Sequence, residues 1–308
     1  MKGDTSQMIA KLHLYTLLKM TDNTVLAVLY GMISQASKQS ILPRFDGSAF
    51  NDINYKANMD IVTDADTEMQ SSIIDGLHRH WPHISVLGEE QSHLMQHAVM
   101  SNDKQAFWVL DPIDGTSNFA FGIPYFCISL SLIYQGVVRL GLVYDPMRDE
   151  CFFASHGAGA WFNGNRLHSR ELKAKADLKH AMALVDFKRL PMALSAGLAS
   201  RPPYRSQRSF GASALDWCWI AANRCQLYLH GDQKLWDYSA GQLILREAGG
   251  MSCAFDGSSV FNNSLQSRTV IGASHPFLFE QWREWLSPYL HSFDSPMKRG
   301  DVRLIDPG

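Results

Sequence analysis

The chain has 308 residues, 46% of them hydrophobic, and carries 28 basic against 30 acidic residues. A chain of this length can bury a large core, and its balanced charge gives no reason to expect nucleic acid as a partner. No apolar run approaches the roughly 18 residues of a membrane span, and five cysteines without a C-x-x-C pair are typical of reduced thiols, so we expect a cytoplasmic protein without membrane contact.

The first half of the chain alternates helical and strand-like patterns after a polar start. Residues 1–22 are polar and irregular, and we expect a flexible segment there. The spacing of apolar residues then predicts helices over 23–40 and 64–80, strands over 84–87 and 107–110, a hairpin over 126–144 and a strand over 151–154. Within the hairpin, Gln135-Gly136 joins two β-rich runs, which is the pattern of a two-residue turn.

The second half repeats this mixture of elements. It predicts, in order, a strand over 183–187, a helix over 213–222, a strand over 226–229, a helix over 237–248, a strand over 269–273 and a helix over 276–290. We expect one domain over 23–290, in halves of about 23–175 and 176–290, and a loose tail over 291–308. Hairpins mixed with helices favour a layered α/β fold with mixed sheets over a parallel, doubly wound sheet.

The segment D-P-I-D-G-T-S-N-F, residues 111–119, carries the strongest chemical signal. The apolar run before it brings Asp111 to the end of a strand, which we expect to stop at Pro112 because proline has no backbone donor. Asp111 and Asp114 are close enough to repel unless a cation intervenes, and hard oxygen ligands suit magnesium. Gly115-Thr116-Ser117 then predicts a helix start whose N–H groups could hold a phosphate. The alternative interpretation is a solvated turn with aspartate caps.

Three other acidic segments could add to such a site. Gly88-Glu89-Glu90 follows a predicted strand, with an exposed acidic turn as the alternative. Asp237 lies where a predicted strand gives way to a helix, and its alternative role is an N-cap. The run D-I-V-T-D-A-D, residues 60–66, stands at another predicted helix start, where Thr63 or Asp64 could act as the cap.

Taken together, these segments resemble the inositol monophosphatase family. The strings G-E-E, D-P-I-D-G-T-x-N-F, W-D-x-x-A-G and D-x-V-T-x-x-D occur here in the family's order and spacing, and the similarity spans roughly residues 25 to 290. The family belongs to a superfamily of lithium-sensitive, magnesium-dependent phosphatases. The resemblance implies an alternating αβαβα sandwich with mixed, largely antiparallel sheets, and often a homodimer.

The resemblance also implies which residues bind metal. Glu89, Asp111 and the backbone carbonyl of Ile113 should hold one Mg²⁺. Asp111, Asp114 and Asp237 should hold a second, with Asp111 bridging the two. A weaker third ion near Glu89 would give two to three ions per site.

By the same resemblance, the chain should hydrolyse a small phosphate monoester with a metal-activated water. Thr116, hydrogen-bonded to Asp66, is the counterpart of the residue that orients and deprotonates this water. Threonine alone is a poor base, so Asp66 and the metal must provide the driving force. Lys56 is the counterpart of a lysine near the metal site.

Substrate contacts are expected from two glycine-containing segments and a histidine: Gly115, Thr116, Ser117, Gly211, Ala212, Ser213 and His230. Relatives that favour inositol phosphates commonly place a glutamate at the position of His230. A neutral histidine cannot offer the acceptor pair of a carboxylate, although Asp232 could substitute.

The substrate therefore stays open at this stage. Inositol 1-phosphate is the default, and adenosine 3',5'-bisphosphate, fructose 1,6-bisphosphate, another sugar phosphate, histidinol phosphate and NADP remain alternatives. A hypothesis of another class is a regulatory or RNA-associated binding protein that has kept the phosphatase fold. The intact acidic residues favour the enzyme.

Overall fold

A computed structural model describes residues 22–45, 54–55, 61–102, 105–168 and 177–289. The expectations for the tail over 291–308, for Lys56, and for residues 1–21 of the N-terminal segment lie outside the described residues. Most of the expected junction between the two halves, at 169–176, lies outside them as well. Among the described helices, none is long and apolar enough to cross a lipid bilayer.

The first large sheet has seven strands in the order β3-β4-β5-β6-β7-β8-β9. These are β3 (Ser85–Gly88), β4 (Phe107–Asp114), β5 (Cys127–Tyr134), β6 (Val137–Asp145), β7 (Glu150–Ser155), β8 (Gly159–Phe162) and β9 (Asn165–Leu167). Only β3 and β4 run parallel; the other neighbours are antiparallel. Gln135 and Gly136, at φ 53° and 67°, form the predicted turn between β5 and β6, since a type I′ turn requires two positive φ angles.

The second large sheet has five strands in the order β11-β10-β12-β14-β13. They are β10 (Met182–Asp186), β11 (Ser206–Arg208), β12 (Leu227–Gln233), β13 (Met251–Ala254) and β14 (Arg268–Ala273). Strands β11, β10 and β12 are parallel, whereas β14 is antiparallel to both of its neighbours. A two-stranded pair, β1 (Asn54–Tyr55) with β2 (Ile61–Val62), lies apart from both sheets.

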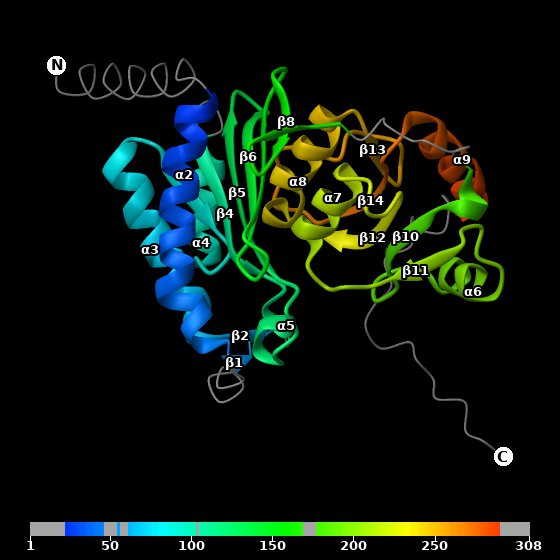
Figure 1. Cartoon of the computed structure of the whole chain (residues 1–308), viewed down its shortest axis with the longest axis horizontal. Helices are drawn as coiled ribbons and strands as arrows, with labels where there is room; N and C mark the ends of the chain where they lie inside the picture. The colour runs from blue at the N-terminus through cyan, green and yellow to red at the C-terminus, as the bar shows by residue number, and fades with distance from the viewer. Residues whose placement is uncertain (1–21, 46–53, 56–60, 103–104, 169–176, 290–308) are drawn as a thin grey trace.

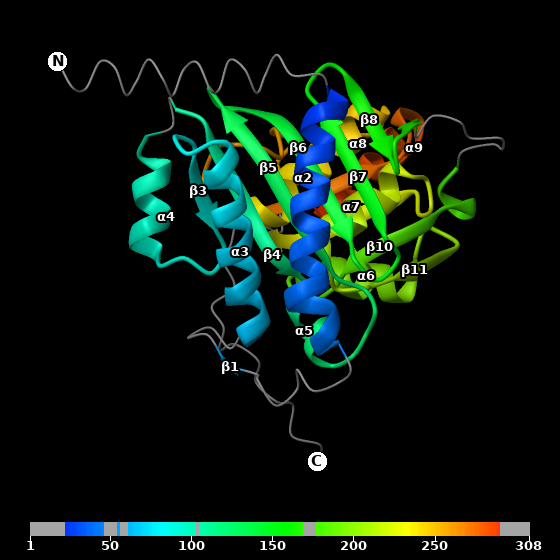
Figure 2. The same ribbon diagram turned by 60° about the vertical axis from the view of Figure 1, so that its left-hand side comes forward.

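Helices form three layers around these sheets, as Figure 1 shows. Their bounds are α2 (Asp22–Ala36), α3 (Asp64–His80), α4 (His93–Met100), α5 (Thr116–Ala120), α6 (Met192–Ser200), α7 (Ser213–Ala221), α8 (Leu235–Ala248) and α9 (Pro276–Leu286). Helices α2 and α3 run side by side across the outer face of the seven-stranded sheet (Figure 2), α7 and α8 lie between the sheets, and α6 and α9 cover the five-stranded sheet. This arrangement confirms the αβαβα sandwich with mixed sheets.

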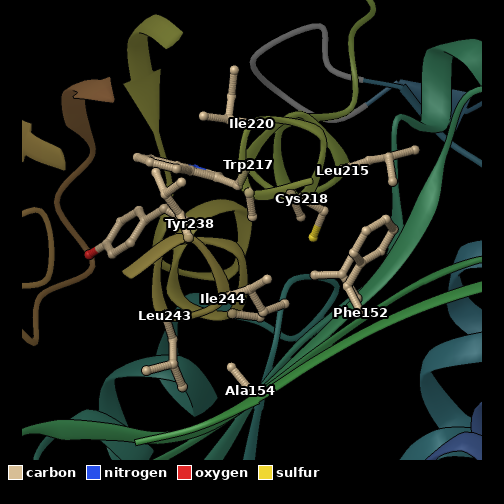
Figure 3. Packing of buried hydrophobic residues seen from close by; sticks show 14 of the residues in the cluster. Phe152, Ala154, Leu215, Trp217, Cys218, Ile220, Tyr238, Leu243 and Ile244 are labelled. Carbon is tan, nitrogen blue, oxygen red and sulfur yellow. The ribbon is translucent and has the colours of Figure 1, made fainter. Parts of the chain in front are cut away.

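The central layer contains the largest buried apolar cluster. Figure 3 shows Trp217 of α7 and Tyr238 of α8 packed within it, with Phe152 of β7 on the facing sheet. A Cβ at Gly241 would lie 2.5 Å from the Cβ of Trp217, so only glycine at this position allows α7 and α8 to approach so closely. The first turns of both helices are thereby brought to the same end of the sandwich.

Two details of the predicted elements are wrong. Strand β4 does not stop at Pro112 but continues to Asp114, and its pairing with β5 is irregular between Asp111 and Asp114. The ladder is interrupted where proline has no donor, so the strand accommodates it at a bulge. The pattern also missed several short elements of the described residues: α4, α6, β8, β9, β11 and β13.

Candidate active site

Three aspartates converge where the end of β4 meets the start of α8. Asp111 and Asp114 lie at the end of β4, and Asp237 lies in the first turn of α8. Each can offer a carboxylate oxygen such that the three atoms lie within 4.8 Å of one another. Asp111 and Asp114 are buried, and Asp237 is half-buried. The fold therefore concentrates acidic oxygens from distant parts of the chain at one point.

The position of Asp237 depends on how α8 begins. The helix starts at Leu235, two residues earlier than predicted, so Asp237 is the third helical residue and not its N-cap. Its Oδ2 accepts a hydrogen bond from the backbone N–H of Lys234 at 2.8 Å. The hydroxyl of Ser129 in β5 donates to the carbonyl oxygen of Trp236 at 2.9 Å, which ties this turn to the seven-stranded sheet.

Asp114 is held by the start of α7. Its Oδ2 accepts the backbone N–H of Ala214 at 2.6 Å, and the thiol of Cys127 lies 3.7 Å from the same oxygen. The predicted substrate segment Gly211-Ala212-Ser213 directly precedes Ala214, and its last residue, Ser213, is the first residue of α7. The hydrogen bond from Ala214 therefore connects the carboxylate of Asp114, a predicted metal ligand, to the predicted substrate segment.

Glu89 reaches the cluster from the turn after β3. Its backbone N–H donates to the carbonyl of Leu110 at 3.0 Å, and its carboxyl group shares a hydrogen bond with that of Asp111. Gln96 of α4 donates to the carbonyl oxygens of Gly88 and Glu89 at 3.0 and 3.1 Å. A Cβ at Gly88 would lie 2.2 Å from Oε1 of Gln70, so a larger residue there would displace the Gln70 side chain. Sequence reasoning missed both glutamines, because neither lies in a motif.

Thr116, Asp66 and Ile113 form a hydrogen-bonded group beside the carboxylates. The Thr116 hydroxyl lies 3.1 Å from Oδ1 of Asp66 and 2.9 Å from the carbonyl oxygen of Ile113. A hydroxyl has one proton, so it can donate to only one of these two oxygens at a time. The other carboxylate oxygen of Asp66 accepts the backbone N–H of Thr63 at 2.7 Å, which fixes Asp66 as part of the α3 cap.

Gly115 makes the junction between β4 and α5 possible. Its φ is +95°, and a Cβ there would lie 3.1 to 3.2 Å from Ala212, Phe126 and the carbonyl of Tyr125. The side chain of Asn118 donates to the carbonyl oxygens of Tyr125 and Phe210 at 2.7 and 2.6 Å. These contacts hold the helix start predicted at Gly115 against the segment that begins at Gly211.

Burial and the charges of neighbouring carboxylates raise the pKa of the four aspartates at this site. Burial is the main cause for Asp114 and Asp66, whose pKa values rise to about 6. Burial and the nearby charge of Glu89 raise the pKa of Asp111 well above its ordinary value, and burial and the charge of Asp114 do the same for Asp237. Within the described residues, no lysine or arginine forms an ion pair with Asp111, Asp114 or Asp237. Such a group of hard oxygens fits a divalent cation such as magnesium.

The raised pKa values predict that the stability of the metal-free protein falls as the pH rises through the acidic range. Between about pH 4 and about pH 6 the folded chain retains protons on Asp66 and Asp114 that the unfolded chain has already released. This contribution to stability is fully present below that window and is lost as the pH rises through it. We expect Asp114→Asn to weaken this dependence by on the order of 1–3 kcal/mol between about pH 5 and about pH 7.5.

Thermal unfolding with a chelator at both pH values tests this expectation. The wild-type protein should lose more stability than Asp114→Asn when the pH is raised. Equal losses in the two proteins would show that the cluster does not carry the effect.

Ser117, Ser213 and His230 are the remaining predicted site residues. Ser117 is exposed in the first turn of α5, and Ser213 begins α7. His230, in the middle of β12, is buried, and its Nε2 lies 3.4 Å from the Ser213 hydroxyl. The same Nε2 lies 3.0 Å from the carboxylate of Asp186, a residue that sequence reasoning missed because β10 carries no motif. Asp232, the suggested substitute for a glutamate, is paired with Arg189 at 2.8 Å.

Comparison with known proteins agrees with the fold and with the motifs. Residues 22–291 match the model of the inositol monophosphatase family. The Nus factor SuhB of Pasteurella multocida is 34% identical over 68% of this chain and 77% of its own length. Inositol monophosphatase 1 of Solanum lycopersicum is 32% identical over 75% of this chain and 84% of its own length. The structure of a Thermotoga maritima IMPase superposes with a TM-score of 0.70 at 26% identity, over 88% of this chain and 98% of that one.

Proposed function

The chain belongs to the inositol monophosphatase family, and from this premise we propose that it is a magnesium-dependent phosphomonoesterase. One observation carries the proposal: Asp111, Asp114 and Asp237, from distant segments, place oxygens within 4.8 Å of one another without an ion pair to a basic side chain of the described residues. A protein that only bound a partner would gain nothing from a buried cluster of like charges, which costs stability unless cations occupy it.

The residues present would hold two magnesium ions in the way that the resemblance implies. Glu89, Asp111 and the carbonyl of Ile113 would hold one, and Asp111, Asp114 and Asp237 the other. When bound, the ions would supply a water of lowered pKa and would balance charge on the attacking and leaving oxygens.

The side chains around the ions would position and deprotonate the attacking water. The Thr116 hydroxyl can donate its one hydrogen bond to Asp66. The carbonyl oxygen of Ile113 then accepts no hydrogen bond from Thr116 and is free to bind another group. Oδ1 of Asp66 is then the acceptor at the end of a short chain from the water through the threonine hydroxyl. With its pKa near 6, Asp66 is a suitable proton acceptor close to neutral pH.

The phosphate group itself would bind beside α5. Gly115, Thr116 and Ser117 present the first backbone N–H groups of this turn next to Asp114. Inositol 1-phosphate is the proposed substrate, supported by the family and by the relative named inositol monophosphatase 1 in Solanum lycopersicum. Other monoesters of the superfamily stay alternatives because His230 replaces the expected glutamate.

A second candidate function is that of a regulatory binding protein. Relatives that are similar over two thirds of this chain carry the name Nus factor SuhB, which favours this alternative. The expectation that nucleic acid is not a partner, drawn from net charge, therefore stays a prediction, as do the homodimer, the lithium sensitivity and the cytoplasmic location. An enzyme and a binding factor can be one protein, since the acidic site and the outer faces are separate parts of the fold.

Phosphate release from a panel of monoesters tests the proposed function directly. With magnesium present, we expect release from at least one ester to exceed release with chelator by about 100-fold or more, because the ions provide several kcal/mol of transition-state stabilisation. Added lithium should reduce the rate. Absence of magnesium-dependent release from every ester would contradict the enzyme assignment.

A further inference from the structure

The position of His230 raises the question of which group contacts the alcohol part of the substrate. His230 and Asp186 are direct neighbours in the parallel pairing of β12 with β10. Their side chains meet, with Nε2 of His230 3.0 Å from Oδ2 of Asp186. A histidine on one strand is thus combined with a carboxylate on the next.

Both nitrogens of His230 are used within the protein. The backbone N–H of Asp232 donates to Nδ1 at 3.2 Å, so Nδ1 carries the lone pair of the neutral ring. The proton is therefore on Nε2, which donates to Asp186. The neutral ring has no hydrogen-bonding group left for a ligand, and its role is to orient its neighbour.

The carboxylate of Asp186 still has acceptor capacity. One oxygen accepts from His230 and the other accepts the backbone N–H of Lys188 at 2.7 Å. Each carboxylate oxygen has two lone pairs, and 28% of the side-chain surface is exposed, so two further hydrogen bonds are possible. Burial opposes ionisation, but the hydrogen bonds from His230 and Lys188 outweigh it and lower the pKa of Asp186.

This carboxylate is linked to the proposed catalytic site through His230 and the start of α7. The Ser213 hydroxyl is 3.4 Å from Nε2 of His230, and the backbone N–H of the next residue, Ala214, binds Asp114. Asp232, the other carboxylate nearby, is paired with Arg189, whose Nη1 lies 2.8 Å from its Oδ2. A Cβ at Gly231 would lie 2.3 Å from the carbonyl oxygen of Arg189, so the glycine keeps that pair in place.

We propose that Asp186, oriented by His230, is the residue that accepts hydrogen bonds from hydroxyl groups of the substrate's alcohol part. The inference rests on the proposed phosphatase function and specifies its substrate class: phosphate esters of polyhydroxylated alcohols, such as cyclitols and sugars. Two adjacent hydroxyls of such a ring match the two free acceptor directions of one carboxylate. An ester without hydroxyls gains nothing from this residue.

The test compares inositol 1-phosphate with phenyl phosphate, whose alcohol part has no further hydroxyl. Asp186→Asn keeps the size and one acceptor but loses the charge. We expect it to lower the ratio of kcat/KM for inositol 1-phosphate to that for phenyl phosphate by about 10- to 100-fold, mainly through KM, because charged hydrogen bonds are lost. His230→Gln, which retains a donor, should preserve more of this ratio than His230→Leu.

A matched control is available in a second aspartate–histidine pair. Asp177 lies 2.6 Å from His180 on the surface, and Asp177→Asn should leave the ratio unchanged. If Asp186→Asn lowers both activities equally or leaves the ratio within about twofold, the inference is wrong while the phosphatase assignment stands. If the wild-type protein releases phosphate with magnesium from another monoester of the panel but from neither of these two, the inference is wrong and the proposed function stands. If it releases phosphate from no ester of the panel, the proposed function fails and the inference with it.

Discussion

Asp111→Asn is expected to lower kcat at saturating magnesium by about a thousandfold or more, since it removes the carboxylate that would bridge two ions. The side chain is buried, and its Oδ1 accepts the backbone N–H of Ile113 at 3.1 Å. An asparagine can keep this hydrogen bond through its own carbonyl oxygen, so the local backbone has no reason to rearrange. Phosphate release over a range of magnesium concentrations measures the effect.

The same substitution should not destabilise the metal-free protein. Asp111 is surrounded by Glu89, Asp114 and Asp237, so a neutral side chain removes repulsion that the folded state otherwise bears. Asp145→Asn provides the matched contrast, because Asp145 is equally buried but lies 2.7 Å from Arg148. Loss of that charge should destabilise the fold while activity at 25 °C persists.

The pair of variants separates the enzyme from the binding factor. If Asp111→Asn loses phosphate release but still binds a macromolecular partner of the wild-type protein, the two functions use different parts of the fold. Retention of normal phosphate release by Asp111→Asn would show that the acidic cluster is not the catalytic site. Lower thermal stability of this variant in chelator would contradict the electrostatic argument.

The acidic residues of the site were predictable because they lie in short contiguous motifs at element ends. A run of apolar residues followed by Asp111 needs no long-range information to indicate a carboxylate at a strand end. The αβαβα arrangement came from the family resemblance, and the alternation of hairpins and helices agreed with it. The predicted end of β4 at Pro112 was wrong, because proline interrupts the hydrogen-bond ladder only locally and the strand pairing continues on both sides of the bulge.

The residues around the site were not predictable in the same way. Asp186 meets His230 only through the register of β10 with β12, and the sequence does not reveal which strands become neighbours. Gln96 contacts the turn at Glu89 from a helix whose exposed Leu94 and Met95 blur its apolar pattern. Such contacts depend on tertiary packing, and a motif search selects only residues that are close in sequence.

The largest effect on stability is expected for Trp217→Ala. The indole is fully buried between the two sheets (Figure 3), and its Nε1 donates to Oε1 of Gln233 at 3.0 Å. Removal of the ring leaves a cavity against Gly241 and Tyr228 and an unpaired amide oxygen, so we expect the free energy of unfolding to fall by about 3–5 kcal/mol. Thermal or urea unfolding measures this change.

Trp285→Ala is the control, because Trp285 is only partly buried and stacks on Trp282 at the edge of the outer layer. Its effect should be less than half that of Trp217→Ala.

The comparison also tests whether the chain is one domain, since α7 and α8 supply the core of both sheets at once. If they do, the wild-type protein unfolds in a single transition and Trp217→Ala shifts all of it. Two transitions, of which Trp217→Ala moves only one, would show that the halves hold separate cores and that the acidic site spans two independently stable units.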